Sequence, residues 1–254
     1  MCTPNARLKS FVTPVATLVG LLALWELADL IFSFDKVILP SPIEIIGAFF
    51  QNFSKLIAET GVTMIEAVFG FVLGSASAYL LAIVFVHSPA IQKAVYPYAV
   101  ALKSTPLVAI APLLVVWFGN GMLSKVVMSA LVAFFPVLVN SVSGLANIDQ
   151  ELLDLMKSLS ASQWQILIKI RIPNSLGYLF ASLKTATSMS VVGAVIGEYT
   201  GATEGIGHLI NTSSYYLDTP LMFAAIVCIS VSGILFFNLM GILEKKLVFW
   251  KNPS

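Results

Sequence analysis

The chain has 254 residues, of which 58% are hydrophobic and only 11% are charged, and its formal net charge is +1. A soluble domain carries roughly 25% charged residues, so this composition excludes a soluble protein that covers its surface with charge. Three segments (67–92, 126–148 and 219–243) contain no Asp, Glu, Lys or Arg. Each is long enough to cross a bilayer, which takes about 20 residues. The sequence therefore predicts an all-α integral membrane protein.

Six membrane spans are predicted in a single transmembrane domain, residues 1–254. In chain order they cover 11–33, 62–87, 94–118, 123–146, 176–199 and 219–243. The third is the least regular, because Lys103, Pro106 and Pro112 interrupt it and proline removes a backbone donor. Such a break occurs inside a membrane where neighbouring groups satisfy the freed carbonyls.

The distribution of Lys and Arg orients the spans. With the N-terminus inside, nine of these residues fall in cytoplasmic segments and three in outer segments. Cytoplasmic loops of membrane proteins carry such an excess, so both termini and the loop 147–174 are predicted to be cytoplasmic. The outer segments are 35–60, with a short amphipathic helix, and 200–218, which is rich in Gly, Thr and Ser.

The loop 147–174 is a polar, helix-prone insert in an otherwise apolar chain. Apolar residues recur at helical spacing in 152–159 and again in 164–170, with Ser160 between the two runs. This pattern predicts two short helices with a bend, closed by Pro173 before the fifth span. Two interpretations are open: a helix lying on lipid headgroups, or a surface presented to a soluble partner.

The insert resembles the cytoplasmic coupling loop of ABC-importer membrane subunits. The signature of that loop runs Glu-Ala-Ala, three residues, Gly, nine residues, Ile, any residue, Leu-Pro. Counting back from Pro173, the chain places at those positions Asp154, Leu155, Met156, Ser160, Ile170 and Ile172. The spacing is kept, while Asp replaces Glu, Leu-Met replaces the two alanines and Ser replaces Gly.

Further segments resemble one branch of this family, the nitrate/sulfonate/taurine type. They are LPSP at 39–42, LKSTPLVAIAPLLVVWFGNG at 102–121, SLSASQWQILIKIRIP at 158–173 and GEYTGATEGIGHLI at 197–210. The segments occur in the expected order, and the resemblance covers about residues 40–243. The chain thus resembles the inner-membrane permease subunit of a binding-protein-dependent ABC transporter.

The resemblance implies a type I ABC-importer-like permease fold that forms a homodimer in a bacterial-type cytoplasmic (inner) membrane. Expected partners are two copies of a cytoplasmic ABC ATPase, an extracytoplasmic solute-binding protein, a second copy of the chain and the lipid bilayer, with no nucleic acid. ATP and Mg would be used by the partner ATPase, because the chain has no phosphate-binding G-x-x-x-x-G-K-[ST] loop. The chain itself is expected to bind no cofactor or metal and to catalyse no reaction. Contact with the ATPase is expected from Asp154, Lys157, Ser160, Ala161, Trp164 and Pro173.

Ionisable groups inside spans suggest where a solute passes. Lys103 and Lys184 could form a positive pair that attracts an anion, or could be snorkelling or ion-paired structural residues, which is the favoured interpretation. Small and hydroxylated residues of the fifth span allow close helix packing and could equally line a polar path. The candidate path comprises Lys103, Thr105, Lys184, Ser188 and Glu198.

The function implied is the import of a small solute delivered by a binding protein. The resemblance suggests nitrate, a sulfonate such as taurine, bicarbonate or a vitamin precursor, and the two lysines favour an anion. A stand-alone secondary transporter driven by an ion gradient is the alternative. A membrane enzyme has less support, because the sequence contains no catalytic constellation.

Overall fold

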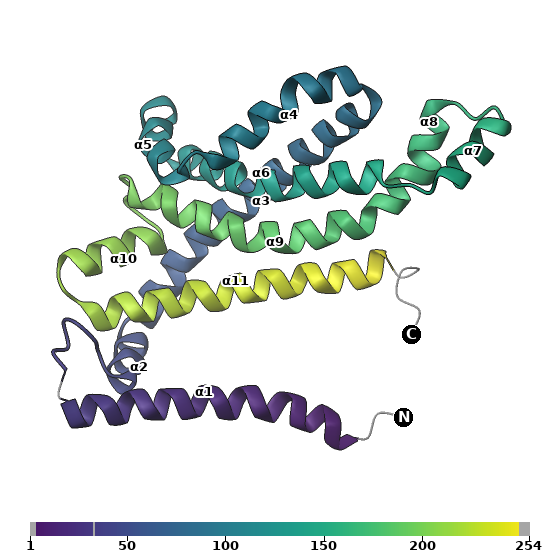
Figure 1. Cartoon of the computed structure of the whole chain (residues 1–254). Coiled ribbons are helices and arrows are strands. Elements are labelled where there is room, and N and C mark those ends of the chain that lie inside the picture. Colours follow the sequence, from purple (N-terminus) through teal and green to yellow (C-terminus); the bar gives the residue numbers. More distant parts are fainter. Residues whose placement is uncertain (1–3, 33, 249–254) are drawn as a thin grey trace. The chain divides into compact units, whose positions relative to one another are not determined.

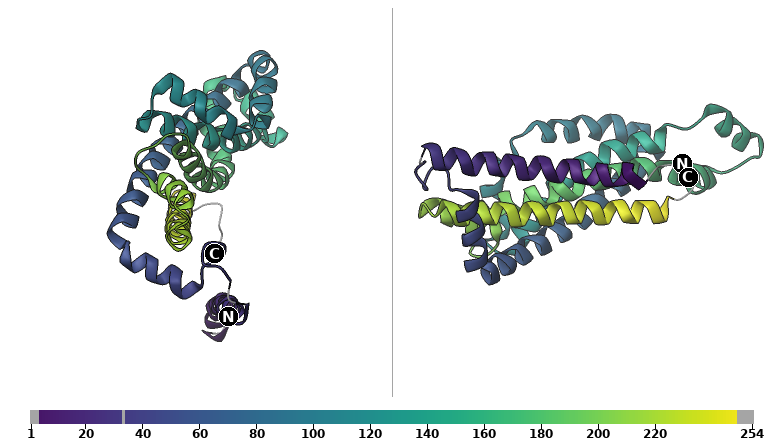
Figure 2. Two further views of the ribbon diagram at one scale, coloured as in Figure 1. Left: turned by 90° about the vertical axis from the view of Figure 1, so that its left-hand side faces the viewer. Right: turned by 90° about the horizontal axis from the view of Figure 1, so that it is seen from below.

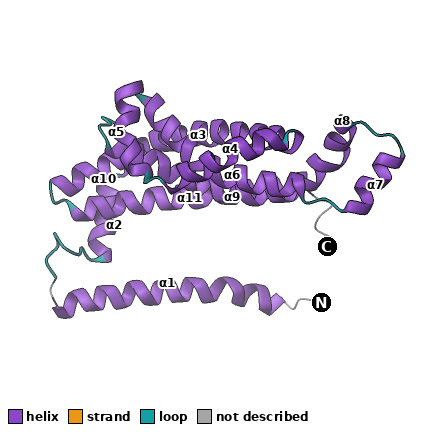
Figure 3. Cartoon of the chain, turned by 45° about the horizontal axis from the view of Figure 1, so that its top comes forward, coloured by secondary structure: helices purple, strands orange, loops and turns teal. Residues whose placement is uncertain are grey.

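The computed structural model describes residues 4–32 and 34–248, without the side chains of 4–12 and 102–104. The described residues are helical and contain no strand (Figure 3). The chain divides into two compact units, Met1–Ile57 with Leu209–Cys228 and Ala58–His208 with Ile229–Ser254. The all-helical fold class predicted from composition is confirmed.

The first unit contains helices α1 (Pro4–Phe32) and α2 (Pro42–Gln51), the start of α3 (Phe53–His87), most of α10 (Ile206–Tyr215) and the start of α11 (Thr219–Leu247). Helix α2 is the short helix predicted in the segment 35–60. A reciprocal capping box between Ser41 and Glu44, with Pro42 in the first turn, explains why it begins there. The ring of Trp25 packs edge-on against Phe223 at 6.0 Å.

The second unit contains the remaining helices. In chain order these are most of α3, α4 (Pro89–Ser104), α5 (Leu107–Phe118), α6 (Met122–Ala146), α7 (Gln150–Ser158), α8 (Gln163–Ile166), the π-helical turn η1 (Leu167–Arg171), α9 (Ile172–Tyr199), the start of α10 and the part of α11 from Ile229 onwards. Helices α6 and α9 lie side by side along their lengths (Figure 1). This pair connects the two ends of the unit.

The packing of α6 against α3 and α9 centres on Ser129, which is fully buried. Its hydroxyl donates to the Ser190 carbonyl at 2.9 Å and lies 3.4 Å from the Ala67 carbonyl. A Cβ at Gly70 would lie 2.3 Å from the Ser129 side chain, and one at Gly193 would lie 2.7 Å from the Ser129 Cα. Glycine at these two positions therefore lets three helix backbones approach closely, as in other membrane helix bundles.

Five helices of the described chain are long and apolar enough to cross a membrane. They are Thr13–Phe32 within α1, α3, α6, the continuous helix Gln163–Tyr199, and α11. The predicted third span is divided into α4 and α5, with Thr105 and Pro106 between them. Because Pro106 has no N–H, the helical ladder is interrupted there, as predicted. The interruption predicted at Pro112 is not observed, because Pro112 lies inside α5.

Two helices extend beyond the membrane spans predicted within them. Helix α3 begins at Phe53, before the predicted span 62–87, and the helix that contains the predicted span 176–199 begins at Gln163. Pro173 does not end a helix, because η1 widens the ladder just before it. The Ile172 N–H donates to the Leu167 carbonyl, five residues back, and such a π turn relieves the clash of a proline ring with the preceding turn.

Because the helix backbones approach closely at Ser129, adding one methyl group there should lower the stability of the protein strongly. We expect Gly193→Ala to lower stability by about 1–3 kcal/mol, because the added Cβ meets the α6 backbone. At Gly233 an added Cβ would meet no heavy atom within 4 Å, so Gly233→Ala should be neutral or stabilising. The apparent unfolding temperature of the two detergent-purified variants checks this. A Gly193→Ala protein as stable as Gly233→Ala would contradict the packing described.

Candidate functional site

Helices α7 and α8 project beyond one end of the α6–α9 pair (Figures 1 and 2). Asp149 caps α7 by accepting from the Glu151 N–H at 3.0 Å, and no residue of α7 is buried. Three leucines spaced along it, Leu152, Leu155 and Leu159, are 42%, 55% and 68% exposed. The helix therefore presents apolar side chains that nothing in the described chain covers.

Helix α7 ends in a Schellman motif centred on Ser160. The Ser160 N–H donates to the Lys157 carbonyl at 2.9 Å, and the Ala161 N–H donates to the Met156 carbonyl at 3.0 Å. Ser160 has φ +56°, the left-handed conformation that glycine usually adopts at this position of a helix end. The serine thus takes the backbone geometry for which the coupling-loop signature has glycine.

The base of the loop is fixed to the end of α6 by side chains from the start of α9 and from η1. The Arg171 guanidinium donates to the Leu145 carbonyl at 2.7 Å. The Asn174 amide donates to the carbonyls of Gly144 at 3.1 Å and Asn147 at 2.8 Å. These bonds satisfy carbonyls that have no partner within α6, and the positive charge suits a helix C-terminus.

The other predicted coupling residues lie on the same projecting segment. Asp154 and Lys157 form an exposed ion pair at 3.0 Å, and the Lys157 ammonium lowers the pKa of Asp154 below its usual value. Trp164 is 61% exposed, and its ring meets the edge of His87 at the end of α3. Pro173 lies in the first turn of α9 behind η1, apart from the exposed surface of α7.

The residues predicted to line a path are not gathered in one site. The Lys184 ammonium lies 2.7 Å from the Glu244 carboxylate of α11, a partner that the sequence analysis did not foresee. Thr105 and Ser188 are exposed, while Glu198 is buried. Lys103 belongs to α4, and its side chain lies outside the described part of the structure. Because Glu244 neutralises Lys184, that lysine no longer argues for an anionic solute.

Glu198 takes part in a polar cluster at the opposite end of α9 from α7. Its two carboxylate oxygens accept from the Thr63 hydroxyl and the Gly207 N–H, each at 2.5 Å. The Thr63 hydroxyl accepts from the Ile206 N–H at 2.8 Å, and Glu59 accepts from the Gly205 N–H at 2.6 Å. The first N–H groups of α10, which have no partner within the helix, are thus satisfied by side chains of α3 and α9.

The glycines around this cluster are required by contact. Gly205 has φ +104°, and a Cβ there would lie 2.1 Å from a Glu198 oxygen. At Gly207 the corresponding distance is 2.6 Å. The sequence analysis noted these glycines but did not connect them to Glu198. The signal that could have done so is an acid followed by two glycines seven and nine residues later.

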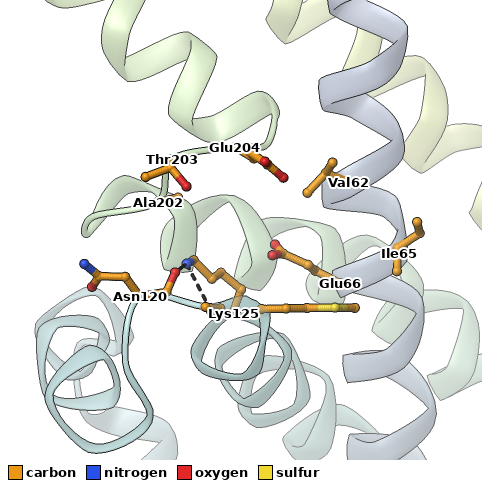
Figure 4. Close-up of a pocket in the computed structure, with 10 residues that line it drawn as sticks. Val62, Ile65, Glu66, Asn120, Lys125, Ala202, Thr203 and Glu204 are labelled. Atoms are coloured by element: carbon orange, nitrogen blue, oxygen red, sulfur yellow. Dashed lines mark hydrogen bonds between the residues drawn. The ribbon is translucent and has the colours of Figure 1, made fainter.

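A pocket of about 340 Å³, lined by both polar and apolar side chains, lies beside the cluster (Figure 4). Its lining residues are Val62, Ile65, Glu66, Asn120, Gly121, Met122, Lys125, Ala202, Thr203 and Glu204. Glu66 and Lys125 are only 4% and 3% exposed. The Lys125 ammonium donates to the backbone carbonyls of Asn120 and Gly121. In the described chain, no group of His, Cys, Asp or Glu could hold a metal ion.

These features define a class of protein: a helical protein with several apolar spans and an exposed loop fixed to two of them. The chain matches the family described as "binding-protein-dependent transport system inner membrane component" over residues 70–249. It is 35% identical over 256 residues to the riboflavin transport system permease protein RibX of Chloroflexus aurantiacus, covering 98% of this chain and 96% of the relative. It is 31% identical over 246 residues to the formylaminopyrimidine transport permease protein ThiX of Halalkalibacterium halodurans, covering 95% and 96%.

The fold agrees with that assignment. A solved amino acid ABC transporter chain superposes with a TM-score of 0.63 at 16% identity, covering 78% of this chain and 97% of the other. The chain therefore belongs to the family of binding-protein-dependent transport system inner membrane components. It is a permease component of an ABC importer for a small solute, and the branch predicted from the sequence is confirmed. The comparisons give no support to a stand-alone secondary transporter.

Because the backbone of Ser160 is in the left-handed conformation, we predict that glycine at this position would make the end of α7 more stable. We expect Ser160→Gly to stabilise the end of α7 by about 1 kcal/mol, because a residue with a Cβ is strained in that conformation. Amide exchange at 156–161, measured by mass spectrometry, should slow by about fivefold, the factor that corresponds to 1 kcal/mol.

The matched control is Ser158→Gly, inside the last turn of the same helix. Glycine costs about 1 kcal/mol in a helix interior, so this variant should exchange faster. Equal effects of the two substitutions would contradict the assigned turn.

Removal of the Glu198 carboxylate should loosen the start of α10. In Glu198→Leu the Gly207 N–H loses its acceptor, while the Thr63 hydroxyl keeps only the Glu59 carbonyl, and a buried unsatisfied group costs about 1–3 kcal/mol. We expect amide exchange in 205–208 to accelerate by about tenfold or more, with Glu198→Gln intermediate because its amide keeps one acceptor. Tyr199→Phe, at the exposed neighbouring position, is the control. Unchanged exchange in a folded Glu198→Leu protein would show that the cluster does not hold this segment.

Proposed function

We propose that the chain forms a homodimer whose two α7 helices dock on two copies of a cytoplasmic ATPase. The observation that carries this proposal is the exposed apolar surface of α7 on a loop fixed to the ends of α6 and α9. A helix of this kind fits the helix-in-groove mode of recognition, in which spaced apolar side chains enter a groove. Asp154 and Trp164 would contribute polar and aromatic contacts around those leucines.

The bonds at the base of the loop support a mechanical role. Arg171 and Asn174 tie the loop to α6, and α8, η1 and α9 form one continuous helix. A displacement of α7 would therefore move α6 and α9 as a body rather than deform the loop. ATP-driven closure of the two ATPases would thus switch the dimer between inward-facing and outward-facing states.

The membrane arrangement in this proposal has six crossings within one permease domain. The broken helices α4 and α5 together provide the third crossing, and Thr105 helps to satisfy the break because its hydroxyl bonds the Ala101 carbonyl at 3.4 Å. Both termini and α7 lie on the cytoplasmic side, as the Lys and Arg distribution favours. The start of α10 and its glycine-rich loop then face the extracytoplasmic side, where a solute-binding protein delivers its cargo.

The solute belongs to the range of compounds that appear in the names of the relatives. Riboflavin and formylaminopyrimidine, from the names of RibX and ThiX, favour a vitamin-like compound. Thr105 and Ser188 are candidates for the polar path, because both side chains are exposed in the single chain. Lys184 and Glu244 act as a structural pair between α9 and α11.

Docking of α7 is tested by co-purification of the host's ABC ATPase with the tagged chain. We expect the double variant Asp154→Lys, Trp164→Ala to retain the ATPase about tenfold less well than the wild type, because interface anchors typically cost 2 kcal/mol or more when removed. Glu204→Lys, on the loop before α10, is the matched charge-reversal control and should retain the ATPase fully. Equal retention by the double variant and the wild type, in folded protein, would refute docking through α7.

A further inference from the structure

Two buried carboxyl groups meet beside the pocket in Figure 4. Glu66 of α3 is 4% exposed and Glu198 of α9 is 1% exposed. Their side chains are hydrogen-bonded to each other, while Glu66 Oε2 meets no N–H or hydroxyl donor among the described residues. An ionised carboxylate only accepts hydrogen bonds, so two carboxylates cannot bond each other. One of the two groups therefore carries a proton.

The hydrogen bonds around the pair place this proton on Glu66. Glu198 accepts from the Thr63 hydroxyl and from the Gly207 N–H, and such donors stabilise the ionised form of a carboxyl group. Glu66 Oε2 receives no donor of this kind from the described part of the chain. A protonated Glu66 supplies Glu198 with a further donor, and its own buried oxygen then no longer lacks a partner.

The charge of the surroundings agrees with this assignment. The Lys125 ammonium of α6 acts on both carboxyl groups, and its side chain is also buried, with 3% exposed. One ammonium balances one buried carboxylate, whereas a second carboxylate would stay uncompensated, which is costly away from water. With one proton on Glu66, the three groups are together neutral.

Other ionisable groups lie on the elements around the pair and could contribute to a pH dependence. They are Glu59 of α3, Tyr199 of α9, Glu204 of the loop before α10 and His208 of α10. Glu59 accepts from the Gly205 N–H, and Glu204 is exposed. His208 titrates nearest to neutral pH among these residue types, so it needs its own control.

We propose that Glu66 and Glu198 form a proton-binding site that holds one proton at neutral pH and thereby fixes the start of α10. On release, the proton leaves Glu66 for water and the electrons of the O–H bond stay on the Glu66 oxygen. Two carboxylates are then in contact, and their repulsion weakens the bond between Glu198 and the Gly207 N–H. In the proposed function this end of α9 faces the delivering protein, and on that function rests the further inference that the site responds to the pH outside the membrane.

Infrared spectroscopy of the full-length chain in an ester-free detergent detects the proton directly. Ordinary carboxyl groups have a pKa of about 4 and are ionised at neutral pH, so the C=O stretching band of a protonated acid there reports an unusual group. We expect this band in the wild type and its loss in Glu66→Gln. Glu204→Gln, an exposed acid of the same pocket, is the matched control and should keep the band.

Amide exchange connects the proton to α10. We expect the protection of 205–208, corrected for the intrinsic pH dependence of exchange, to fall about tenfold when the pH is raised about two units above neutrality. That factor corresponds to one lost hydrogen bond to a charged group. Glu66→Gln should remove the pH dependence, because its amide donates to Glu198 without a proton that titrates. His208→Asn and Glu204→Gln should retain it.

Three results would overturn the proposal: no protonated band in the folded wild type, an unchanged band in folded Glu66→Gln, or protection of 205–208 that does not fall as the pH rises. If Glu66→Gln does not fold, the wild-type spectrum and the pH profiles of the wild type and His208→Asn decide. The same preparations are scored for ATPase co-purification. ATPase retained without the band removes this inference alone, whereas the band without ATPase removes the proposed docking and leaves the proton site.

Discussion

Close approach of three helix backbones at Ser129 is the constraint on which the second unit depends. Lipid is as apolar as leucine, so membrane helices associate through tight packing and buried hydrogen bonds rather than through hydrophobic burial. Gly70 and Gly193 remove the side chains that would keep α3 and α9 away from α6, and the Ser129 hydroxyl bonds the backbone of α9. This contact holds the α6–α9 pair together towards the end that is remote from α7, and it lets the pair act as one rigid body. The loop at one end and the start of α10 at the other are both attached to that body.

Polar side chains at the two ends of the pair act on the backbone rather than on each other. Arg171 and Asn174 bond carbonyls at the end of α6, and Glu198 bonds an N–H at the start of α10. Each contact satisfies a backbone group that a helix end leaves unpaired. It therefore stabilises the helix end and also fixes the direction in which the attached loop leaves the helix. The conformations of the two functional loops are thus set by the helices beneath them. A motion of α6 and α9 would be transmitted to both loops.

The lengths of the apolar segments predicted the positions of the apolar helices more accurately than the residues at which those helices begin. The prediction 123–146 matches α6 (Met122–Ala146) almost residue for residue, because its polar flanks coincide with the helix ends. Helix α3 and the helix starting at Gln163 continue beyond the apolar stretch, and composition carries no signal for that continuation. The break at Pro106 was predictable because proline has no backbone N–H to donate. The helix continues through Pro173 because of a π turn, and no pattern in the sequence predicted that turn. The Glu198 cluster joins Thr63 and Glu198, 135 residues apart in sequence, which a single sequence cannot bring together.

The role of a charged residue within the helices depends on whether it has a partner, not on whether it is positive or negative. Lys184 is neutralised by Glu244, Lys125 is bonded to carbonyls, and Glu198 caps a helix, so these three groups serve the structure. A charge that is already paired adds little selectivity for a solute, because a passing ion would have to compete with its partner. The sequence drew attention to the lysines because a positive charge in a membrane span is rare, but the structure pairs Lys184 with Glu244 and so gives that lysine a structural role.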